Sequence, residues 1–432
     1  MVAEPTTAAP DVIEQVLTRL SDTKPGEQEL LGFARAYYRR VPAESMGPVP
    51  DAVAEVESLF EFIRNRAYEV MVRVFDPTTA SHGYEATGTV IEIALPDSPF
   101  ALDSVLNEIQ ARQLEVVKLV HPVVGIERTR GELTKVRSAR ETTNRESVQH
   151  YVLDRFLTGE EKESLEQRVF DILHDVRSVV EDFHAMSGRV DRMIDLARIA
   201  GSHHSEADVR EAIDFLNWLR DDNFVFLGFR EYQIEDTAGG RSVSVVPNSG
   251  LGILRDAAGS RMAKSTLLSD LPKELAARFE GGDLIVITKT NSMSTIHRRA
   301  RMDYVGVRLL DADGRTVGEA RLLGLYTSRA YMEPASKTPI LRRKLDKILV
   351  TEDLIEGSHD HKAVIQLFEG FSKHDLFAAP TDALRSELMG LLSLEERQQV
   401  KVFVRRDLLK RSISILVSLP RDRFNAPLRK QI

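Results

Sequence analysis

The sequence contains no cysteine among its 432 residues and only one tryptophan. It also has no apolar run near the ~20 residues needed to cross a bilayer. Without cysteine the chain cannot form disulfides or thiolate metal sites, and it has no thiolate nucleophile. Its start, MVAEPTTAAPDVIEQ, is polar and lacks the apolar core of a signal peptide. These absences predict a cytoplasmic protein that makes no membrane contact.

The sequence also has no excess of basic residues over acidic ones. Lysine and arginine number 58 against 66 acidic residues, which gives a formal net charge of -8. Because nucleic acids are bound chiefly through basic groups, we do not expect general nucleic-acid binding. Apolar residues make up 42% and charged residues 29% of the chain, as in ordinary globular proteins. A chain of this length suggests about three domains, or two with helical connectors.

Strand-like and helix-like segments alternate from about Tyr68 onward. MVRVF and TVIEIAL are β-rich runs, and a helix with Leu102 and Val105 on one stripe follows them. LEVVKLVHPVVGIER reads as one strand, with RGELTKV as its hairpin partner, and SVQHYVLDRFL as another strand. A long helix is expected from about Glu160 to Met186. This pattern predicts a small α+β sandwich of one sheet and its helices.

The hydrophobic pattern also predicts the elements of residues 1–67 and of the chain from residue 187 onward. Amphipathic helices in residues 1–67 are expected to be docking elements, and residues 187–222 a helical connector. FVFLGFREYQI, LIVITK, DYVGVRLLD and ARLLGLYT predict a second β-rich region, with DADG as a tight hairpin turn. VKVFVRR and SISILVSL predict a final hairpin. Since a hairpin cannot form a stable core alone, we expect it to begin a truncated third domain.

No motif predicts catalysis. Gly250 and Gly252 lack the third glycine and following helix of a dinucleotide-binding turn, so we expect a plain turn. His203 with His204, and the HDH run from position 359, lack a third ligand for a metal. The basic stretches HRRAR and VRRDLLKR are interpreted as surface charge, with anion or carboxylate binding as the alternative. Four hundred residues without a catalytic constellation indicate regulation or assembly.

Several stretches, in order, resemble the N-terminal part of the large NAD-specific glutamate dehydrogenases of bacteria. They are DSPFALDSVLNEI with LVHPVVGIER, WLRDDNFVFLGFREY with GLGIL, ITKTNSMSTIHRRARMDYVGV, GEARLLGLYTSRAY with TPILRRKLDKIL, and KVFVRRDLLKRSISILVSLPRDRFNAPLR. The resemblance implies that the β-rich regions are ACT-like domains, which are small βαββαβ modules. The expected order is N-terminal tail and helices 1–67, ACT-like domain 68–186, connector 187–222, second ACT-like domain 223–358, connector 359–395, and the start of a truncated third ACT-like domain 396–432.

This resemblance also implies a function and partners. The parent enzyme would convert L-glutamate, water and NAD+ to 2-oxoglutarate, ammonium and NADH. Such an enzyme needs a lysine in a glycine-rich loop to activate a water or the 2-oxo group, and a glycine-rich Rossmann turn to bind NAD. Neither is present in this sequence. We therefore expect no catalytic residues, no NAD bound by this segment and no metal. The expected partners are the remainder of the dehydrogenase chain and other subunits, in a homo-oligomer. An alternative is a stand-alone amino-acid-sensing ACT-type binding module, and a third is an enzyme with an unrecognised site.

One loop is the predicted ligand site. In amino-acid-binding ACT domains the loop after the first strand leads into a helix, and by resemblance Asp97, Ser98, Pro99 and Phe100 occupy this place. The free N–H groups of a helix N-terminus can receive a ligand carboxylate. However, Phe100 stands where glycine would allow a ligand to approach the backbone. Its side chain is expected to turn into the core beside Leu102 or to crowd that approach.

Overall fold

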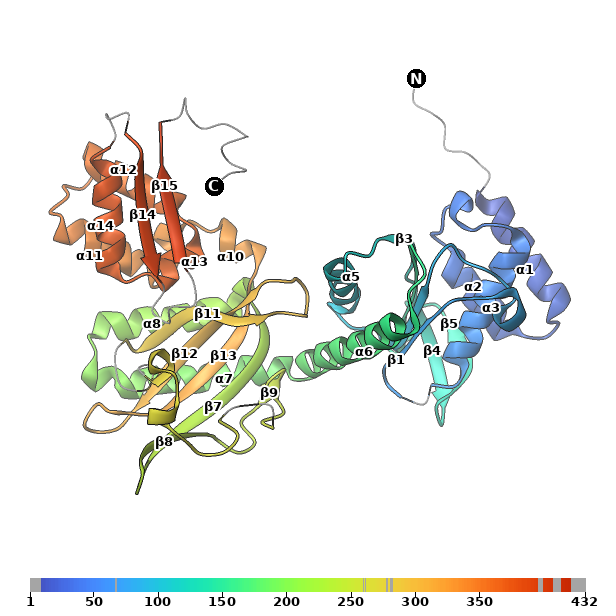
Figure 1. Cartoon of the computed structure of the whole chain (residues 1–432), viewed down its shortest axis with the longest axis horizontal. Helices are drawn as coiled ribbons and strands as arrows, with labels where there is room; N and C mark the ends of the chain where they lie inside the picture. Colours follow the sequence, from blue (N-terminus) through green and yellow to red (C-terminus); the bar gives the residue numbers. More distant parts are fainter. Residues whose placement is uncertain are drawn as a thin grey trace. The chain divides into compact units, whose positions relative to one another are not determined.

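The structure is a computed structural model, and it describes residues 9–66, 68–258, 260, 262–276, 279, 283–394, 399–406 and 413–420. The chain divides into two compact units. The first comprises residues 1–180 with 295–299, and the second residues 181–294 with 300–432 (Figure 1). Among the residues described, no helix has both the length and the apolar character to cross a membrane.

The first unit begins with helices and continues as a sheet with further helices. Its elements are α1 (Ala9–Thr23), α2 (Gln28–Tyr38), η1 (Ala43–Ser45), α3 (Val49–Arg64), β1 (Met71–Phe75), α4 (Thr79–His82), β2 (Val90–Pro96), α5 (Ala101–Ala111), β3 (Val116–Val120), β4 (Val123–Thr129), β5 (Glu132–Arg137), β6 (Arg145–Leu153) and α6 (Gly159–Glu181).

The sheet of this unit has the strand order β1-β2-β6-β4-β5, and β3 also pairs with β6. Since β2 and β3 are both antiparallel to β6, they run parallel to each other with β6 between them. Helix α5 joins β2 to β3, which makes a split βαβ unit. Strand β2 is buried from Val90 to Leu95, as expected when both faces of a sheet are covered. The predicted α+β sandwich of one sheet and its helices is confirmed.

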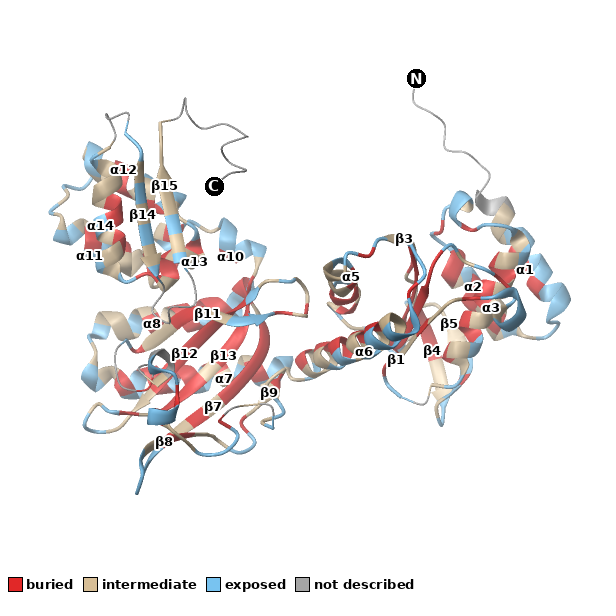
Figure 2. Cartoon of the chain, in the orientation of Figure 1, coloured by how far each residue is buried: buried red, intermediate tan, exposed pale blue. Residues whose placement is uncertain are grey.

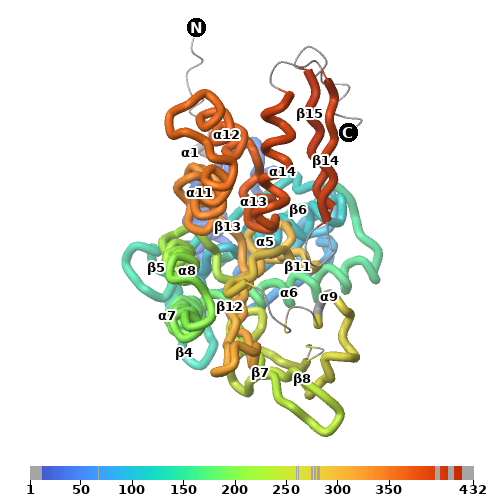
Figure 3. Tube along the Cα trace, turned by 90° about the vertical axis from the view of Figure 1, so that its left-hand side faces the viewer, coloured from blue at the N-terminus to red at the C-terminus, as the bar shows by residue number. Residues whose placement is uncertain are grey.

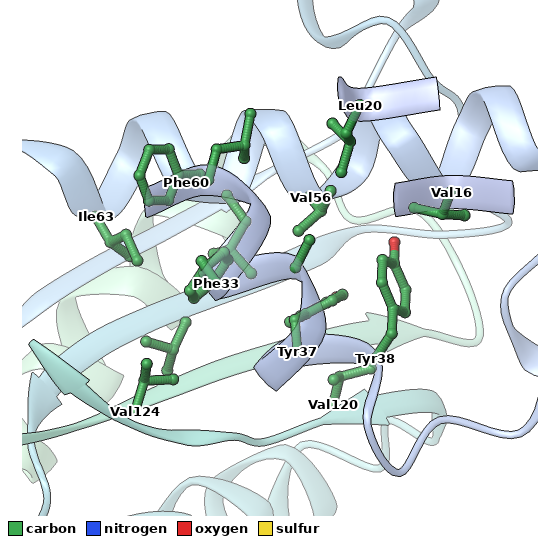
Figure 4. Close-up of a cluster of buried hydrophobic side chains, with 14 of the residues drawn as sticks. Val16, Leu20, Phe33, Tyr37, Tyr38, Val56, Phe60, Ile63, Val120 and Val124 are labelled. Carbon is green, nitrogen blue, oxygen red and sulfur yellow. The ribbon is translucent and has the colours of Figure 1, made fainter. Parts of the chain in front are cut away.

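Helices α1 to α3 cover one face of this sheet. Their apolar side chains form a single cluster with side chains of the strands (Figure 4). Fully or nearly fully buried members from the helices and strands are Val16, Leu20, Phe33, Tyr37, Tyr38, Val56, Phe60, Ile63, Val120 and Val124. The helices therefore dock on the sheet and share its core.

Arg128 on β4 fastens the end of α3 to the sheet. Its guanidinium donates to the carbonyl oxygens of Ile63 at 2.8 Å, Arg64 at 3.2 Å and Gly131 at 2.9 Å. The same group donates twice to the Glu146 carboxylate on β6, at 2.8 Å each. The last carbonyls of a helix have no partner within the helix, so Arg128 supplies part of the missing hydrogen bonding.

The second unit begins with helices, continues as a sheet, and ends with helices and a hairpin. Its elements are α7 (Phe183–Ile199), η2 (Ala200–His203), α8 (Glu206–Trp218), η3 (Leu219–Asn223), β7 (Phe224–Thr237), β8 (Gly240–Val245), β9 (Leu251–Gly252), β10 (Thr266–Leu267), η4 (Leu268–Asp270), α9 (Lys273–Ala276), β11 (Ile285–Met293), β12 (Arg301–Leu310), β13 (Thr316–Tyr326), α10 (Ser328–Met332), η6 (Ala335–Lys337), α11 (Leu341–Thr351), α12 (His359–Gly370), α13 (Lys373–Ala378), α14 (Thr381–Leu392), β14 (Lys401–Arg406) and β15 (Ile413–Ser418).

The large sheet of the second unit has the order β10-β8-β7-β13-β12-β11, with β9 beside β7. Its strands pair antiparallel, and the predicted turn at Asp311–Gly314 joins β12 to β13. Strands β11, β12 and β13 follow one another without an intervening helix, and α7, which packs against this sheet, precedes it in the chain. This order differs from the βαββαβ module expected for residues 223–358, because strands joined by short connections become antiparallel neighbours.

Strands β14 and β15 form a separate two-stranded sheet beside the last helices of the second unit (Figures 1 and 3). One face packs on α14, where Arg405 bonds to Glu387 at 2.6 Å. The other face carries Val402, Val404 and Ile415, each more than half exposed. Figure 2 shows this sheet in tan and pale blue, in contrast to the mostly red β7, β12 and β13. The predicted final hairpin is confirmed.

Two predicted elements are divided in the structure. LEVVKLVHPVVGIER forms β3 and β4 instead of one strand, because Pro122 between them has no N–H to donate to β6. The helix expected from Glu160 to Met186 ends at Glu181, and α7 begins at Phe183. At the break, the Asp182 carboxylate accepts a hydrogen bond from the Gly252 N–H at 2.7 Å.

Candidate functional site

The predicted ligand loop, residues 97–100, joins β2 to α5 in the first unit. Asp97 is exposed, and its N–H donates to the Arg145 carbonyl at 2.9 Å. The Ser98 hydroxyl donates to the Pro96 carbonyl at 2.9 Å. Pro99 is exposed and Phe100 is the residue that precedes the helix. The four predicted site residues thus lie together, at the N-terminus of a helix of 11 residues.

Phe100 does not lie in the core beside Leu102. It is half-buried, and its ring centroid lies 5.1 Å from that of His297. Its backbone is left-handed, with φ 69°. This conformation is uncommon for a residue other than glycine and is strained for a bulky side chain. The Phe100 ring therefore lies at the helix N-terminus, the position where a glycine would allow a ligand to approach.

Buried polar side chains lie on the sheet next to the 97–100 loop. On β6, the Gln149 amide donates to the Ser147 hydroxyl at 2.9 Å, and the Tyr151 hydroxyl donates to Gln149 at 2.5 Å. His121 Nε2 lies 2.8 Å from the Ser147 hydroxyl. Burial lowers the pKa of His121, while the negative charge of Asp97 opposes this shift. Burial, and secondarily Asp103, raises the pKa of Tyr151.

Sequence reasoning missed this polar row, although the sequence contained a signal for it. Ser147, Gln149 and Tyr151 alternate along SVQHYVL, and β6 pairs them with Leu95, Ile93 and Ile91 of β2. Alternate residues of a strand share a face. Three polar groups at buried positions of one strand face need mutual hydrogen bonds. Their alternation in the sequence therefore indicates a polar layer on one face of this strand, and the register of β6 places this layer beside the end of β2.

A second buried polar cluster lies on the opposite face of the same sheet. Glu55 on α3 accepts from Lys118 and from the Tyr37 hydroxyl, and His150 Nε2 lies 3.7 Å from its carboxylate. His150 Nδ1 lies 3.1 Å from Glu92. Both Glu92 and His150 are fully buried. This cluster joins the N-terminal helices to the sheet, and we interpret it as structural.

The other sequence motifs do not assemble into a site in the described residues. Gly252 lies in β9 and is followed by a turn, as predicted, so the stretch offers no helix N-terminus to a pyrophosphate. His359 is exposed at the start of α12, and the described part of the chain brings together no three metal-binding side chains. The stretch DLLKR, between β14 and β15, lies outside the described residues, as does the stretch from position 421 onward.

The arrangement around the 97–100 loop suits reversible binding better than covalent chemistry. It offers the N-terminus of α5 and a row of hydrogen-bonding side chains, which are His121, Ser147, Gln149 and Tyr151. These side chains already bond to one another, and the Tyr151 hydroxyl donates to Gln149. A helix N-terminus favours a carboxylate or another anion. The loop therefore lies beside groups that could bind a carboxylate through hydrogen bonds.

Comparison with family models gives the class of protein. The glutamate dehydrogenase ACT1 domain matches residues 33–169, helical motif 1 of the same enzyme matches residues 338–397, and its ACT2 domain matches residues 401–432. The ACT1 match covers α3, the sheet of the first unit and the 97–100 loop.

Comparison with whole proteins points the same way. The chain is 32% identical over 427 residues to the NAD-specific glutamate dehydrogenase of Halomonas elongata, with 97% of this chain and 26% of the relative covered. It is 30% identical over 368 residues to that of Pseudomonas aeruginosa, covering 84% of this chain and 22% of the relative. The match to the Mycobacterium tuberculosis enzyme is 24% over 349 residues, or 80% of this chain and 20% of the relative.

These matches place the chain in the family of large NAD-specific glutamate dehydrogenases, where it corresponds to the region of ACT1, helical motif 1 and ACT2. The resemblance found in the sequence is confirmed. The chain spans about a quarter of the length of these relatives, at 26% and 22%.

Proposed function

We propose that this chain is the N-terminal regulatory and assembly segment of an NAD-dependent glutamate dehydrogenase, and that it is itself non-catalytic. The parent reaction converts L-glutamate, water and NAD+ to 2-oxoglutarate, ammonium and NADH. The observation that carries the proposal is the order of the three family matches, which follow one another along this chain. NAD would be bound by the remainder of the parent enzyme, in the cytoplasm.

The finer domain organisation belongs to this proposal. Residues 396–432 would begin a further ACT-like domain that is completed by elements of the longer chain. Two observations support this. The ACT2 match begins at residue 401, and β14–β15 carries Val404 and Ile415 on an outward face, at 65% and 63% exposure. Apolar side chains on one face of a two-stranded sheet are normally covered by a further layer.

The proposal is tested by an assay of the purified chain. NADH formation from glutamate should remain at the level of the blank, at any protein concentration. A longer version of the chain that includes the remainder of the family's domains should form NADH under the same conditions. Turnover that increases in proportion to the purified 432-residue chain would contradict the proposal.

The alternative function is amino-acid sensing by a stand-alone ACT-type module. The observation that favours it is the polar row of Ser147, Gln149 and Tyr151 beside the 97–100 loop. A ligand at 100 times its dissociation constant would stabilise the folded state by about 2.7 kcal/mol, which is easily detected as a melting shift. We expect no shift with glutamate, aspartate or asparagine, because Phe100 crowds the loop. A saturable shift that Asp97→Ala abolishes, without changing the unliganded melting temperature, would establish the alternative.

A further inference from the structure

Two neighbouring cross-strand rows on one face of the large sheet of the second unit hold more basic side chains than acidic ones. The first row contains Arg308 of β12, Glu319 of β13 and Tyr232 of β7, and the second contains Gly306, Arg321 and Arg230 of the same strands. Residues directly opposite each other in antiparallel strands share a face, and like charges placed there repel. The two rows thus bring together three arginines and one carboxylate, all of them largely buried.

Two of these three arginines have partners within the protein. The Arg321 guanidinium donates to the Tyr232 hydroxyl at 2.8 Å and lies 4.0 Å from the centroid of the Tyr232 ring. It also donates to the Glu319 carboxylate at 3.3 Å. Arg230 donates to the Leu254 carbonyl at 3.1 Å, in the loop after β9. The protein itself therefore holds both of these guanidiniums in place.

Arg308 differs from the other two arginines. It is only 5% exposed, and among the described residues no group accepts a hydrogen bond from its buried Nε or Nη1. Burial lowers the pKa of Arg308, and the negative charges of Glu319 and Asp283 oppose this shift without bonding to either nitrogen. A buried charged donor without an acceptor is costly, and in folded proteins such a group usually meets a bound water or ion.

We propose that Arg308 anchors a binding site for a small oxyanion, namely a carboxylate or phosphate group, on this face of the sheet. A guanidinium suits both groups, because its planar N–H donors match their oxygens. Arg308 lies two residues before Leu310, where β12 ends, and the turn that follows contains the exposed Asp313. The site is thus near an end of the sheet. It lies wholly within the second unit and does not depend on the 97–100 loop.

Two substitutions separate a ligand-binding arginine from a structural one. Arg308→Met removes the charge and keeps a long side chain. Without an anion, this variant should melt at the same temperature as the unaltered chain or higher, because a buried charge without a counter-charge destabilises the free protein. Arg315→Met is the matched control, since Arg315 is exposed on the same hairpin. It should change neither the melting temperature nor anion binding.

Binding is measured by equilibrium dialysis with labelled inorganic phosphate and labelled succinate, in chloride buffer of constant ionic strength. We expect one of these two probes to bind the unaltered chain and Arg315→Met, and neither to bind Arg308→Met. Which probe binds distinguishes a phosphate site from a carboxylate site. At 100 times its dissociation constant, that probe should raise the melting temperature of the unaltered chain by roughly 5–10 °C.

Three results would overturn the proposal. The first is the absence of bound phosphate and succinate at millimolar concentrations of the unaltered chain and probe. The second is an equal rise in melting temperature for Arg308→Met, which would be the general effect of salts that are excluded from protein surfaces. The third is binding of either probe by Arg308→Met as tightly as by the unaltered chain. If circular dichroism shows that Arg308→Met is unfolded, Arg308→Lys replaces it and should bind at least roughly tenfold more weakly, because lysine lacks the planar fork.

Discussion

Glu55 on α3 and Lys118 on β3 form a largely buried ion pair, in which the ammonium lies 2.7 Å from both carboxylate oxygens. Burial alone would raise the pKa of Glu55, but the neighbouring charges of His150 and Lys118 hold it below its ordinary value. The carboxylate is therefore charged where it meets the sheet. The pair joins a helix near the N-terminus to a strand of the ACT1 region.

The first prediction concerns this pair. Glu55→Gln should destabilise the first unit by about 3 kcal/mol, because it leaves the Lys118 ammonium buried without its counter-charge. Hydrogen exchange of α3 amides during urea titration would measure the loss. Glu61→Gln on the same helix removes only an exposed contact with Arg64 and should change stability by under about 1 kcal/mol. Equal effects of the two substitutions would contradict this interpretation.

The second prediction concerns Lys344 on α11, which caps the C-terminus of α13. Its ammonium donates to the carbonyls of Leu376 at 2.8 Å, Phe377 at 2.9 Å and Ala379 at 2.7 Å. Lys344→Met should destabilise this helical region by about 1–3 kcal/mol, because it leaves buried carbonyls unsatisfied. Lys362→Met, at an exposed position on α12, is the control. Urea unfolding monitored by hydrogen exchange in α13 should shift only for Lys344→Met.

The third prediction concerns acid sensitivity of the contact between α8 and α11. Burial would raise the pKa of Asp208, but hydrogen bonds from Lys347 and Ser205, with a weaker one from Arg343, lower it to about 2. A carboxylate whose pKa falls on folding stabilises the protein fully above its unfolded pKa, near 3.9. This stabilisation is lost as the pH falls from about 4 through about 2.

Asp208→Asn should therefore reduce stability at neutral pH and flatten the dependence of stability on pH in that window. Glu206→Gln, which alters an exposed pair with Arg210, should leave the dependence unchanged. The measurement is the unfolding midpoint of the second unit from pH 2 to pH 7. If Asp208→Asn and the unaltered chain lose stability in parallel as the pH falls, the Asp208 carboxylate is not the cause of the acid sensitivity.

The fourth prediction is self-association through β3. Among the described strands, β3 pairs only with β6, and it exposes Val117 at 56% and Leu119 at 39%. An open apolar edge favours pairing with another chain. We expect light scattering at micromolar concentrations to give a mass above 48.6 kDa. Leu119→Lys should shift the mass toward the monomer. A strict monomer for the unaltered chain would refute the proposed homo-oligomer.

Local patterns predicted the elements whose partners are close in the sequence. The turn at Asp311–Gly314 carried its own signal in DADG. Ser205 and Ser358 accept hydrogen bonds from the Asp208 and His361 N–H groups at the starts of α8 and α12, so these helix ends also depend on neighbouring residues. Each of these features is determined by residues within a few positions.

Features that depend on distant partners were not predicted. The break at Asp182 is tied to Gly252, 70 residues away along the chain, and the polar row depends on the register of β6 against β2. The position of His297 beside Phe100 could not be found from either segment alone. The 97–100 loop itself was located by family resemblance. Its neighbours, the polar row of β6 and His297, are brought to it by the tertiary structure.

The Arg128 contacts have a consequence for the order of events during synthesis. Helix α3 leaves the ribosome before β4, so its end at Ile63 and Arg64 receives these hydrogen bonds only after β4 has emerged. The guanidinium is in turn neutralised by Glu146 on β6, which is made later still. At about 5–20 residues per second, the nascent N-terminal helices wait several seconds for their partner strands. A translational pause before Glu146 would prolong the exposure of Phe33 and Phe60 to chaperones.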